Sequence, residues 1–198
     1  MGAANGAGGS IEPPDSACLG DFAFRAAGAS FVSPTPKDLA LTFSKLAYDP
    51  TLEHPITVVL LATNPSKATV AASPSLLMDT KEEFIAGLEP VFTKATIQAG
   101  RFFSAMPQSK GFVRIRGSAG GLDLQLGNMT LDATTSNDCG QAFVSIVTTV
   151  AASERSKTLV VDGESTTVGA LAGGDAGSDF DLGMLFLAET VSFNFGSL

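Results

Sequence analysis

Apolar and polar residues alternate along much of the chain, and a period of two is the pattern of strands with one buried face. Two further segments contain no charged residue and are rich in apolar and β-branched residues, which favours strands buried on both faces. The alternating segments lie at 21–32, 39–43, 113–116, 122–126, 129–133 and 184–195, and the two charge-free segments lie at 56–62 and 142–150.

The charge-free segment at 142–150 is followed by a predicted hairpin. Two β-rich segments, 159–161 and 164–168, are separated by Asp162-Gly163. A type I′ turn needs positive φ at both of its central residues, and Asp-Gly suits this requirement. We therefore expect 159–161 to pair antiparallel with 164–166.

A meander is predicted between residues 111 and 135. If Ile115 pairs with Leu122, the apolar residues of both strands share one face. The dipeptide at 127–128 is Gly-Asn, which favours a two-residue turn that pairs Leu126 with Met129. This register also sets a row of charged residues on the outer face, namely Arg114, Asp123 and Asp132.

One short helix is predicted after residue 79. Thr80 lies three residues before Glu83, which is the spacing of a capping box. An apolar stripe at 84–88 follows, and Pro90 closes the segment.

These elements predict an all-β fold, an antiparallel β-sandwich with one short helix, for which a jelly-roll arrangement is one form. The chain of 198 residues is an ordinary size for one such domain. We expect residues 18–198 to form that single domain. Residues 1–17 are small, Gly-rich and Pro-containing, which is typical of a flexible tether or of a remnant added for expression.

The charge balance limits the kinds of partner. The formal net charge is −8 at pH 7, and nucleic-acid binding needs clustered Lys and Arg, so we expect no nucleic-acid partner. Apolar runs do not reach the roughly 18 residues of a membrane helix, so we expect no membrane span.

The chain has two cysteines, Cys18 and Cys139, without metal-ligand spacing. Two interpretations are open: a pair of buried free thiols, or a disulfide in an exported protein. The tether-like start fits export, and we expect a secreted, periplasmic or cell-surface protein, although a cytosolic protein with a flexible N-terminus would have the same pattern. If the protein is exported, we expect the two cysteines to be bonded.

The motifs of common catalytic sites are missing from the sequence, and we predict no catalytic residue. The single histidine, His54, lies between Glu53 and Pro55, without a nucleophile motif in its context. Phosphate-binding and dinucleotide-binding glycine loops are also absent.

One glycine-rich loop carries candidate metal ligands. Asp175, Asp179 and Asp181 lie within seven residues of one another. Calcium prefers hard oxygen ligands of this kind, and calcium is therefore the one cofactor that we consider. The spacing differs from that of an EF-hand, so the competing interpretation is a solvated loop of turn-forming residues.

The tripeptide Asn128-Met129-Thr130 is an acceptor sequence for N-linked glycosylation. It has this meaning only in a eukaryotic protein that is secreted.

From these observations we expect a non-catalytic extracytoplasmic module that binds a protein or a polysaccharide partner. Two alternatives stay open. One is a calcium-assisted carbohydrate-binding domain, and the other is a hydrolase that uses paired carboxylates.

Overall fold

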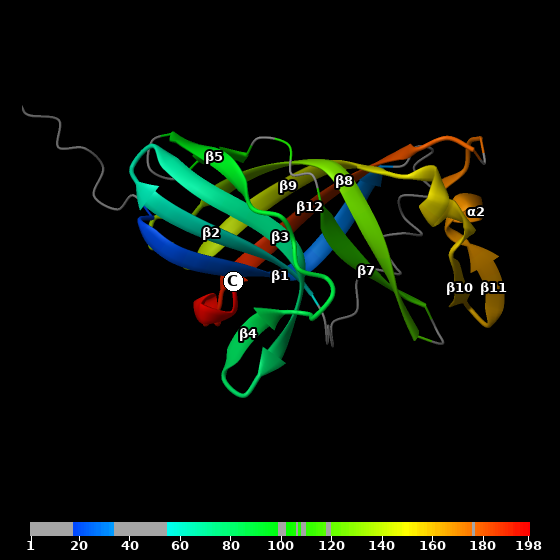
Figure 1. The fold of residues 1–198 in the computed structure, drawn as a ribbon, viewed down its shortest axis with the longest axis horizontal. Coiled ribbons are helices and arrows are strands. Elements are labelled where there is room, and N and C mark those ends of the chain that lie inside the picture. The colour runs from blue at the N-terminus through cyan, green and yellow to red at the C-terminus, as the bar shows by residue number, and fades with distance from the viewer. Residues whose placement is uncertain are drawn as a thin grey trace, which may run out of the picture.

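The computed structural model is built almost entirely of antiparallel strands (Figure 1). It describes residues 18–33, 55–98, 102–105, 107, 110–117, 120–175 and 177–198, so the strand predicted at 39–43 and His54 lie outside it. The elements are β1 (Gly20–Ser33), β2 (Ile56–Asn64), β3 (Lys67–Met78), β4 (Lys81–Phe84), β5 (Thr93–Gln98), β6 (Phe102–Ala105), β7 (Gly111–Gly117), β8 (Gly120–Thr135), β9 (Gln141–Val150), η1 (Ala152–Ser156), β10 (Thr158–Val161), β11 (Glu164–Thr167), α2 (Val168–Ala172), β12 (Phe180–Thr190) and η2 (Phe195–Ser197).

The main sheet closes on itself into a barrel of eight strands. Its strands follow the order β2-β1-β12-β9-β8-β6-β5-β3, and β3 pairs again with β2. The prediction of a sandwich was therefore wrong, although the all-β, antiparallel class is confirmed. Alternation shows that a strand has one buried face, but a sandwich and a barrel both satisfy that pattern.

Apolar side chains fill the interior of the barrel. On β9 the inward residues Val144 and Ile146 are fully buried, whereas the outward Phe143 and Val147 are each 53% exposed. The prediction that this strand is buried on both faces was wrong, because its outer face is exposed; the same prediction is confirmed for β2, where residues 56–60 are all buried and Val59 packs in a second apolar cluster. The largest fully buried side chains are Leu60, Phe103, Ile115, Leu124, Leu126, Met129, Leu131, Ile146, Leu182 and Met184.

The meander at 111–135 is confirmed in its first half. Ile115 pairs with Leu122, and Arg114 pairs with Asp123 through two hydrogen bonds of 2.7 Å. The turn predicted at 127–128 is instead a bulge within the long strand β8, where Asn128 has a φ of 47°. A bulge and a hairpin turn both use a residue with positive φ, so the local sequence does not separate them. As a result Asp132 lies opposite Ser104 and Ser145, away from Arg114.

The helix predicted after residue 79 is absent, and the segment is a β-hairpin. Asp79 has a φ of 55° in the turn, and β4 then pairs with the end of β3, with Phe84 opposite Ser75. A capping box is a local signal, and here the backbone of β4 finds partners on both sides in the sheet and the C-terminal segment.

The segment at 151–179, between β9 and β12, covers one end of the barrel, and we call it the cap. It holds η1, the β10–β11 hairpin and α2, at the right of Figure 1. Leu159, Val168 and Ala172 of the cap are buried in the barrel core. The predicted hairpin is confirmed, since Val160 pairs with Ser165 across a turn in which φ is 53° at Asp162 and 87° at Gly163.

A disulfide lies near the opposite end. Cys18 precedes β1, and Cys139 lies in the β8–β9 turn; their Cα atoms are 5.8 Å apart and 121 residues separate them in sequence. The predicted bond is confirmed, and the interpretation as free thiols was wrong. The described residues include no helix long and apolar enough to cross a membrane.

Candidate binding groove

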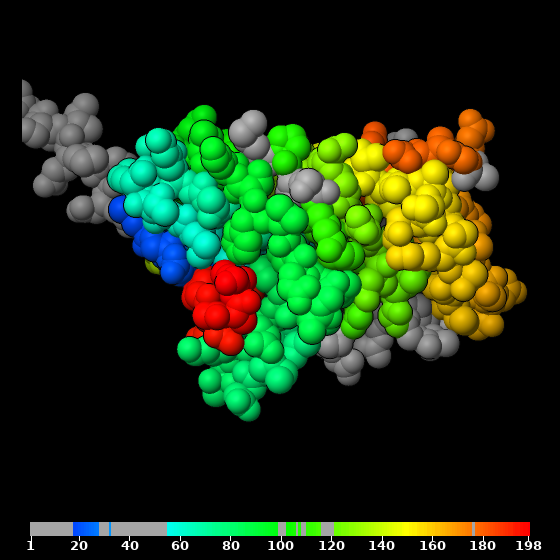
Figure 2. Space-filling model, in the orientation of Figure 1, coloured from blue at the N-terminus to red at the C-terminus, as the bar shows by residue number. Residues whose placement is uncertain are grey.

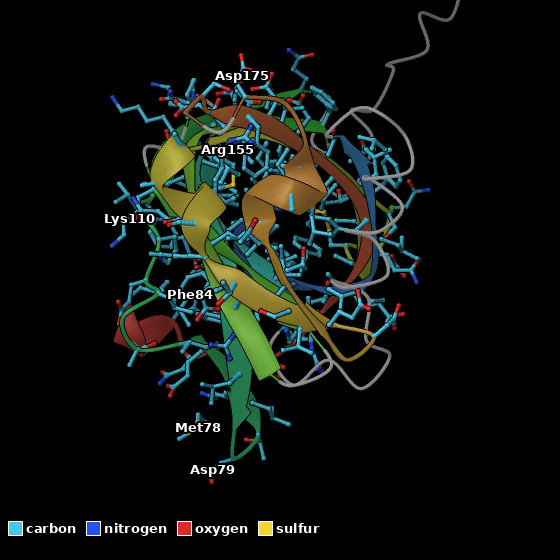
Figure 3. The ribbon with its side chains drawn as sticks, turned by 90° about the vertical axis from the view of Figure 1, so that its right-hand side faces the viewer. Met78, Asp79, Phe84, Lys110, Arg155 and Asp175 are labelled. Atoms are coloured by element: carbon cyan, nitrogen blue, oxygen red, sulfur yellow. A yellow bond between two sulfur atoms is a disulfide. The ribbon has the colours of Figure 1, made fainter. Side chains whose placement is uncertain are left out.

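The β3–β4 hairpin projects from the barrel wall (Figure 2). Its end exposes two large apolar side chains, Leu77 at 59% and Met78 at 52%. Met78 and Asp79 lie at the tip, and Phe84 lies closer to the barrel (Figure 3). An exposed apolar tip beside an apolar hollow marks this region as a candidate interaction site.

An open groove of about 550 Å³ runs beside this hairpin. Three segments build it: the hairpin, the following loop at 86–92 and the C-terminal residues. Most of its lining is apolar, and the polar lining groups are the Glu83 and Glu89 carboxylates and Ser197. The apolar lining residues are Leu76, Met78, Phe84, Ala86, Pro90, Phe92 and Leu198.

The C-terminal wall of the groove is fixed by pairing with β4. The Glu82 N–H donates to the Ser192 carbonyl at 2.7 Å, and the Asn194 N–H donates to the Glu82 carbonyl at 2.8 Å. Phe193 packs edge-on against Phe84, with ring centroids 5.1 Å apart. These contacts bury Phe193 and Phe84 in a small apolar cluster on the outside of the barrel, separate from the main core.

A network of buried polar side chains fixes β4 against the barrel. The Glu82 side chain is 2% exposed and accepts a hydrogen bond of 2.8 Å from Ser75 Oγ, which lies 2.7 Å from Thr57 Oγ1. Arg25 Nη1 lies 3.5 Å from Glu82 Oε1. A buried carboxylate is tolerated when it is paired and hydrogen-bonded, so this network fixes where the hairpin leaves the wall.

The loop at 86–92 is held in a compact turn. Gly87 has a φ of 85°, which favours glycine, and the Leu88 N–H donates to the Ile85 carbonyl at 2.8 Å. The Gly87 N–H donates to Glu89 Oε1 at 2.9 Å and holds the pKa of this carboxyl below its usual value, with Lys110 acting in the same direction. The lowered pKa extends the pH range in which Glu89 is ionised to more acidic values.

The second rim carboxylate, Glu83, accepts a hydrogen bond of 3.3 Å from Asn194 Nδ2. The groove thus combines an apolar floor with two carboxylates at its edge. This arrangement can hold an apolar side chain and favours positive charge beside it.

The predicted calcium ligands lie away from the groove, in and after the cap at one end of the barrel. Asp179 Oδ1 accepts a hydrogen bond of 2.9 Å from the Ala152 N–H, and Asp181 Oδ1 accepts one of 3.4 Å from Thr149 Oγ1. Asp175 is exposed, and its carbonyl accepts from Ser178. Within the described part of the chain, no three His, Cys, Asp or Glu side chains are grouped to hold a metal, and the calcium site stays a prediction.

A smaller polar hollow of about 180 Å³ lies between β8, β9 and η1. Its two carboxylates are engaged by protein donors: Glu154 Oε2 accepts from the Gln125 N–H and from Lys157 Nζ, and Asp179 accepts from Ala152. The other lining residues are Gly127, Asn128, Thr149, Ala151 and Ser153.

A second apolar surface lies on the outside of the barrel. Phe102, Phe143 and Leu187 are 37%, 53% and 46% exposed, and register places them in one row across β6, β8, β9 and β12.

Comparison with known proteins found no match to the chain among protein-family models, curated proteins or solved structures.

Sequence reasoning missed the groove altogether. Its residues come from three separate segments, and the predicted helix at 80–88 placed Glu83 and Phe84 in the wrong element. The one local signal in the sequence is the residue Asp79, which forms turns readily and follows the apolar pair Leu77-Met78, as at a hairpin tip.

Proposed function

We propose that this protein is a non-catalytic, exported binding module whose groove takes a segment of a protein partner. The segment would place a large apolar side chain in the groove and a Lys or Arg side chain beside Glu83 and Glu89. The observation that carries the proposal is the apolar groove with its carboxylate rim beside an exposed hairpin tip.

The volume and lining of the groove favour a protein segment over a polysaccharide. A volume of about 550 Å³ is within the range of about 300–1,000 Å³ typical of binding pockets. Its floor offers few hydrogen-bonding groups for sugar hydroxyls, which would lose their hydration without replacement. An apolar side chain loses nothing of this kind and gains from leaving water.

Charge supports a basic partner. The chain carries a net charge of −8, and the two acidic side chains that line the groove are Glu83 and Glu89. The negative charge would therefore attract a basic segment at long range, and the segment would then pair with the Glu83 and Glu89 carboxylates. Its affinity should fall as the salt concentration rises.

The exported location is supported by the disulfide. Bonds of this kind persist in oxidising compartments and are rare in a reducing cytosol. The Cys18–Cys139 bond and the lack of a membrane-spanning helix in the described residues are compatible with a secreted or surface location.

The test is selection of a displayed library of random linear peptides on the purified, disulfide-bonded protein. We expect enriched peptides to carry Leu, Phe or Met within two or three residues of Lys or Arg. Their affinity for Met78→Asp should fall at least tenfold, because a carboxylate would enter the apolar groove. Glu89→Gln should weaken binding by a smaller factor and reduce its salt dependence.

Val147→Asp is the matched control, because Val147 is 53% exposed, close to the 52% of Met78, but lies on the outer face of β9 and does not line the groove. Glu164→Gln, an exposed acid on the cap, controls for net charge. The proposal is wrong if no peptide is enriched, or if the enriched peptides bind Met78→Asp as tightly as the unmodified protein.

A further inference from the structure

Among the asparagines of the chain, only Asn128 begins an Asn-x-Ser/Thr sequence whose middle residue is not proline. The other candidate by spacing, Asn64-Pro65-Ser66, is excluded as an acceptor because Pro65 occupies the middle position.

The fold presents Asn128 to solvent. It lies at the bulge of β8, where pairing with β9 is interrupted between Gly127 and Thr130, and its φ is 47°. The Asn128 side chain is exposed, whereas its neighbour Met129 is fully buried in the barrel core. A group attached to Asn128 would therefore leave the barrel packing unchanged.

The surroundings of Asn128 suit a sugar. It lines the small polar hollow together with Gln125, Thr149 and Ser153, whose hydroxyl and amide oxygens can accept hydrogen bonds from sugar hydroxyls and amides. The first sugar of a glycan on Asn128 can therefore contact a polar surface of the protein.

We propose that Asn128 carries an N-linked glycan. The co-reactant is a lipid-linked oligosaccharide pyrophosphate: Asn128 Nδ2 forms a bond to C1 of the first sugar, and the C1–O bond to pyrophosphate breaks. The lipid pyrophosphate leaves with the bonding electrons, and the amide loses one proton to a base of the transferase. This inference rests on the proposed export and on a eukaryotic source of the chain, but not on the groove.

The fold also sets the time of the transfer. Thr130 Oγ1 donates to the Val147 carbonyl at 3.2 Å, and Met129 is inside the barrel. Asn128 and Thr130 are exposed in the folded barrel, but an enzyme that must also reach Met129 and a free Thr130 hydroxyl can do so only before β8 pairs with β9, so we expect the transfer to precede closure of the barrel.

The test is expression of the full chain in cultured eukaryotic cells behind a cleavable secretory signal. We expect the intact mass to exceed that of the polypeptide, the excess to be removed by peptide N-glycosidase, and Asp to replace Asn128 in the peptide map after removal. Thr130→Ser should keep the modification, and Thr130→Ala should lose it.

Asn128→Gly is the loss variant, because glycine accepts the positive φ and preserves the bulge. Asn64→Gln, at the Pro-blocked sequence, should leave the mass of the glycan unchanged. The proposal is overturned by an unmodified chain in both cells and medium, or by a glycan that persists in Asn128→Gly. Neither result bears on peptide binding by the groove.

Discussion

The two ends of the barrel are secured by different means. Near one end a covalent bond joins Cys18, ahead of the first strand, to the β8–β9 turn. At the other end the chain inserts the cap, whose apolar residues enter the core and whose loop is held by hydrogen bonds. The first end depends on the redox state of the surroundings, and the second depends on noncovalent contacts alone.

Arg155 is the central contact of the cap. Its side chain is buried, with Nε donating to the Ser178 carbonyl at 2.6 Å and Nη1 donating to the Gly173 carbonyl at 2.7 Å. The guanidinium carbon lies 4.9 Å from the centre of the Phe180 ring. Figure 3 shows Arg155 at this end of the barrel, below the loop that carries Asp175. A cation here joins the end of η1, the loop and the start of β12.

The largest expected effect concerns the disulfide. Replacing both Cys18 and Cys139 by Ala should lower the free energy of unfolding by about 2–5 kcal/mol, because the bond closes a loop of 121 residues in the unfolded chain. Urea denaturation of the variant and of the oxidised protein measures this. A difference below about 1 kcal/mol would mean that noncovalent contacts alone stabilise the end of the barrel that contains the β8–β9 turn.

The cap should be the next most sensitive. Arg155→Met keeps the length of the side chain but removes the donor to the Ser178 and Gly173 carbonyls, which are partly buried, and we expect a loss of about 1–3 kcal/mol. Hydrogen exchange distinguishes the two ends. In Arg155→Met, the amides of the cap should exchange faster than in the unmodified protein, whereas those of the turn at 136–140 should exchange at an unchanged rate. Equal acceleration at both ends would show that they unfold as one unit.

The turn of the cap hairpin gives a smaller, local effect. Gly163→Ala should cost about 1 kcal/mol, because φ is 87° there and a Cβ meets nothing else within 4 Å. Gly177→Ala is the control, since it has similarly open space without positive φ. Thermal unfolding of the two variants compares them directly. Equal midpoints would rule out backbone strain as the cause.

The smallest effect concerns the turn at the disulfide end. Ser136 Oγ and the Gly140 N–H donate to Asp138 and lower the pKa of its carboxyl below its usual value. A lowered pKa in the folded state means that the ionised group stabilises the fold above that pH, and that this contribution is lost as the pH falls through the folded-state pKa. Asp138→Asn should therefore reduce the acid sensitivity of the melting temperature between pH 5 and 2, measured by circular dichroism. An unchanged pH profile would contradict this role.

Local features of the fold could be predicted from the sequence. Asp162 and Gly163 both adopt positive φ readily, which favours the type I′ turn of a two-residue hairpin. The pairing of Ile115 with Leu122 follows from keeping the apolar residues of both strands on one face. The sequence alone did not decide between a disulfide and two free thiols, because no local sequence signal shows that Cys18 and Cys139 lie close together in space.

The closure of the barrel and the groove could not be predicted in this way. Closure depends on β3 meeting β2 and on β1 meeting β12, and no spacing of residues encodes the meeting of two sheet edges. The Thr80–Glu83 spacing suggested a helix, yet the burial of Glu82 beside Ser75 and Arg25 selects a strand. Such a buried partner is visible only in three dimensions.

The pairing of β1 with β12 has a consequence for synthesis of the chain. Phe24 of the first strand lies opposite Thr190 of the last, so the ribosome must deliver almost the whole chain before the wall can close. Until then the apolar inner faces of β2, β8 and β9 have no complete enclosure, and open strand edges invite pairing with other chains. Contacts this distant in sequence also slow folding. Folding of this chain therefore competes with aggregation until β12 has been synthesised.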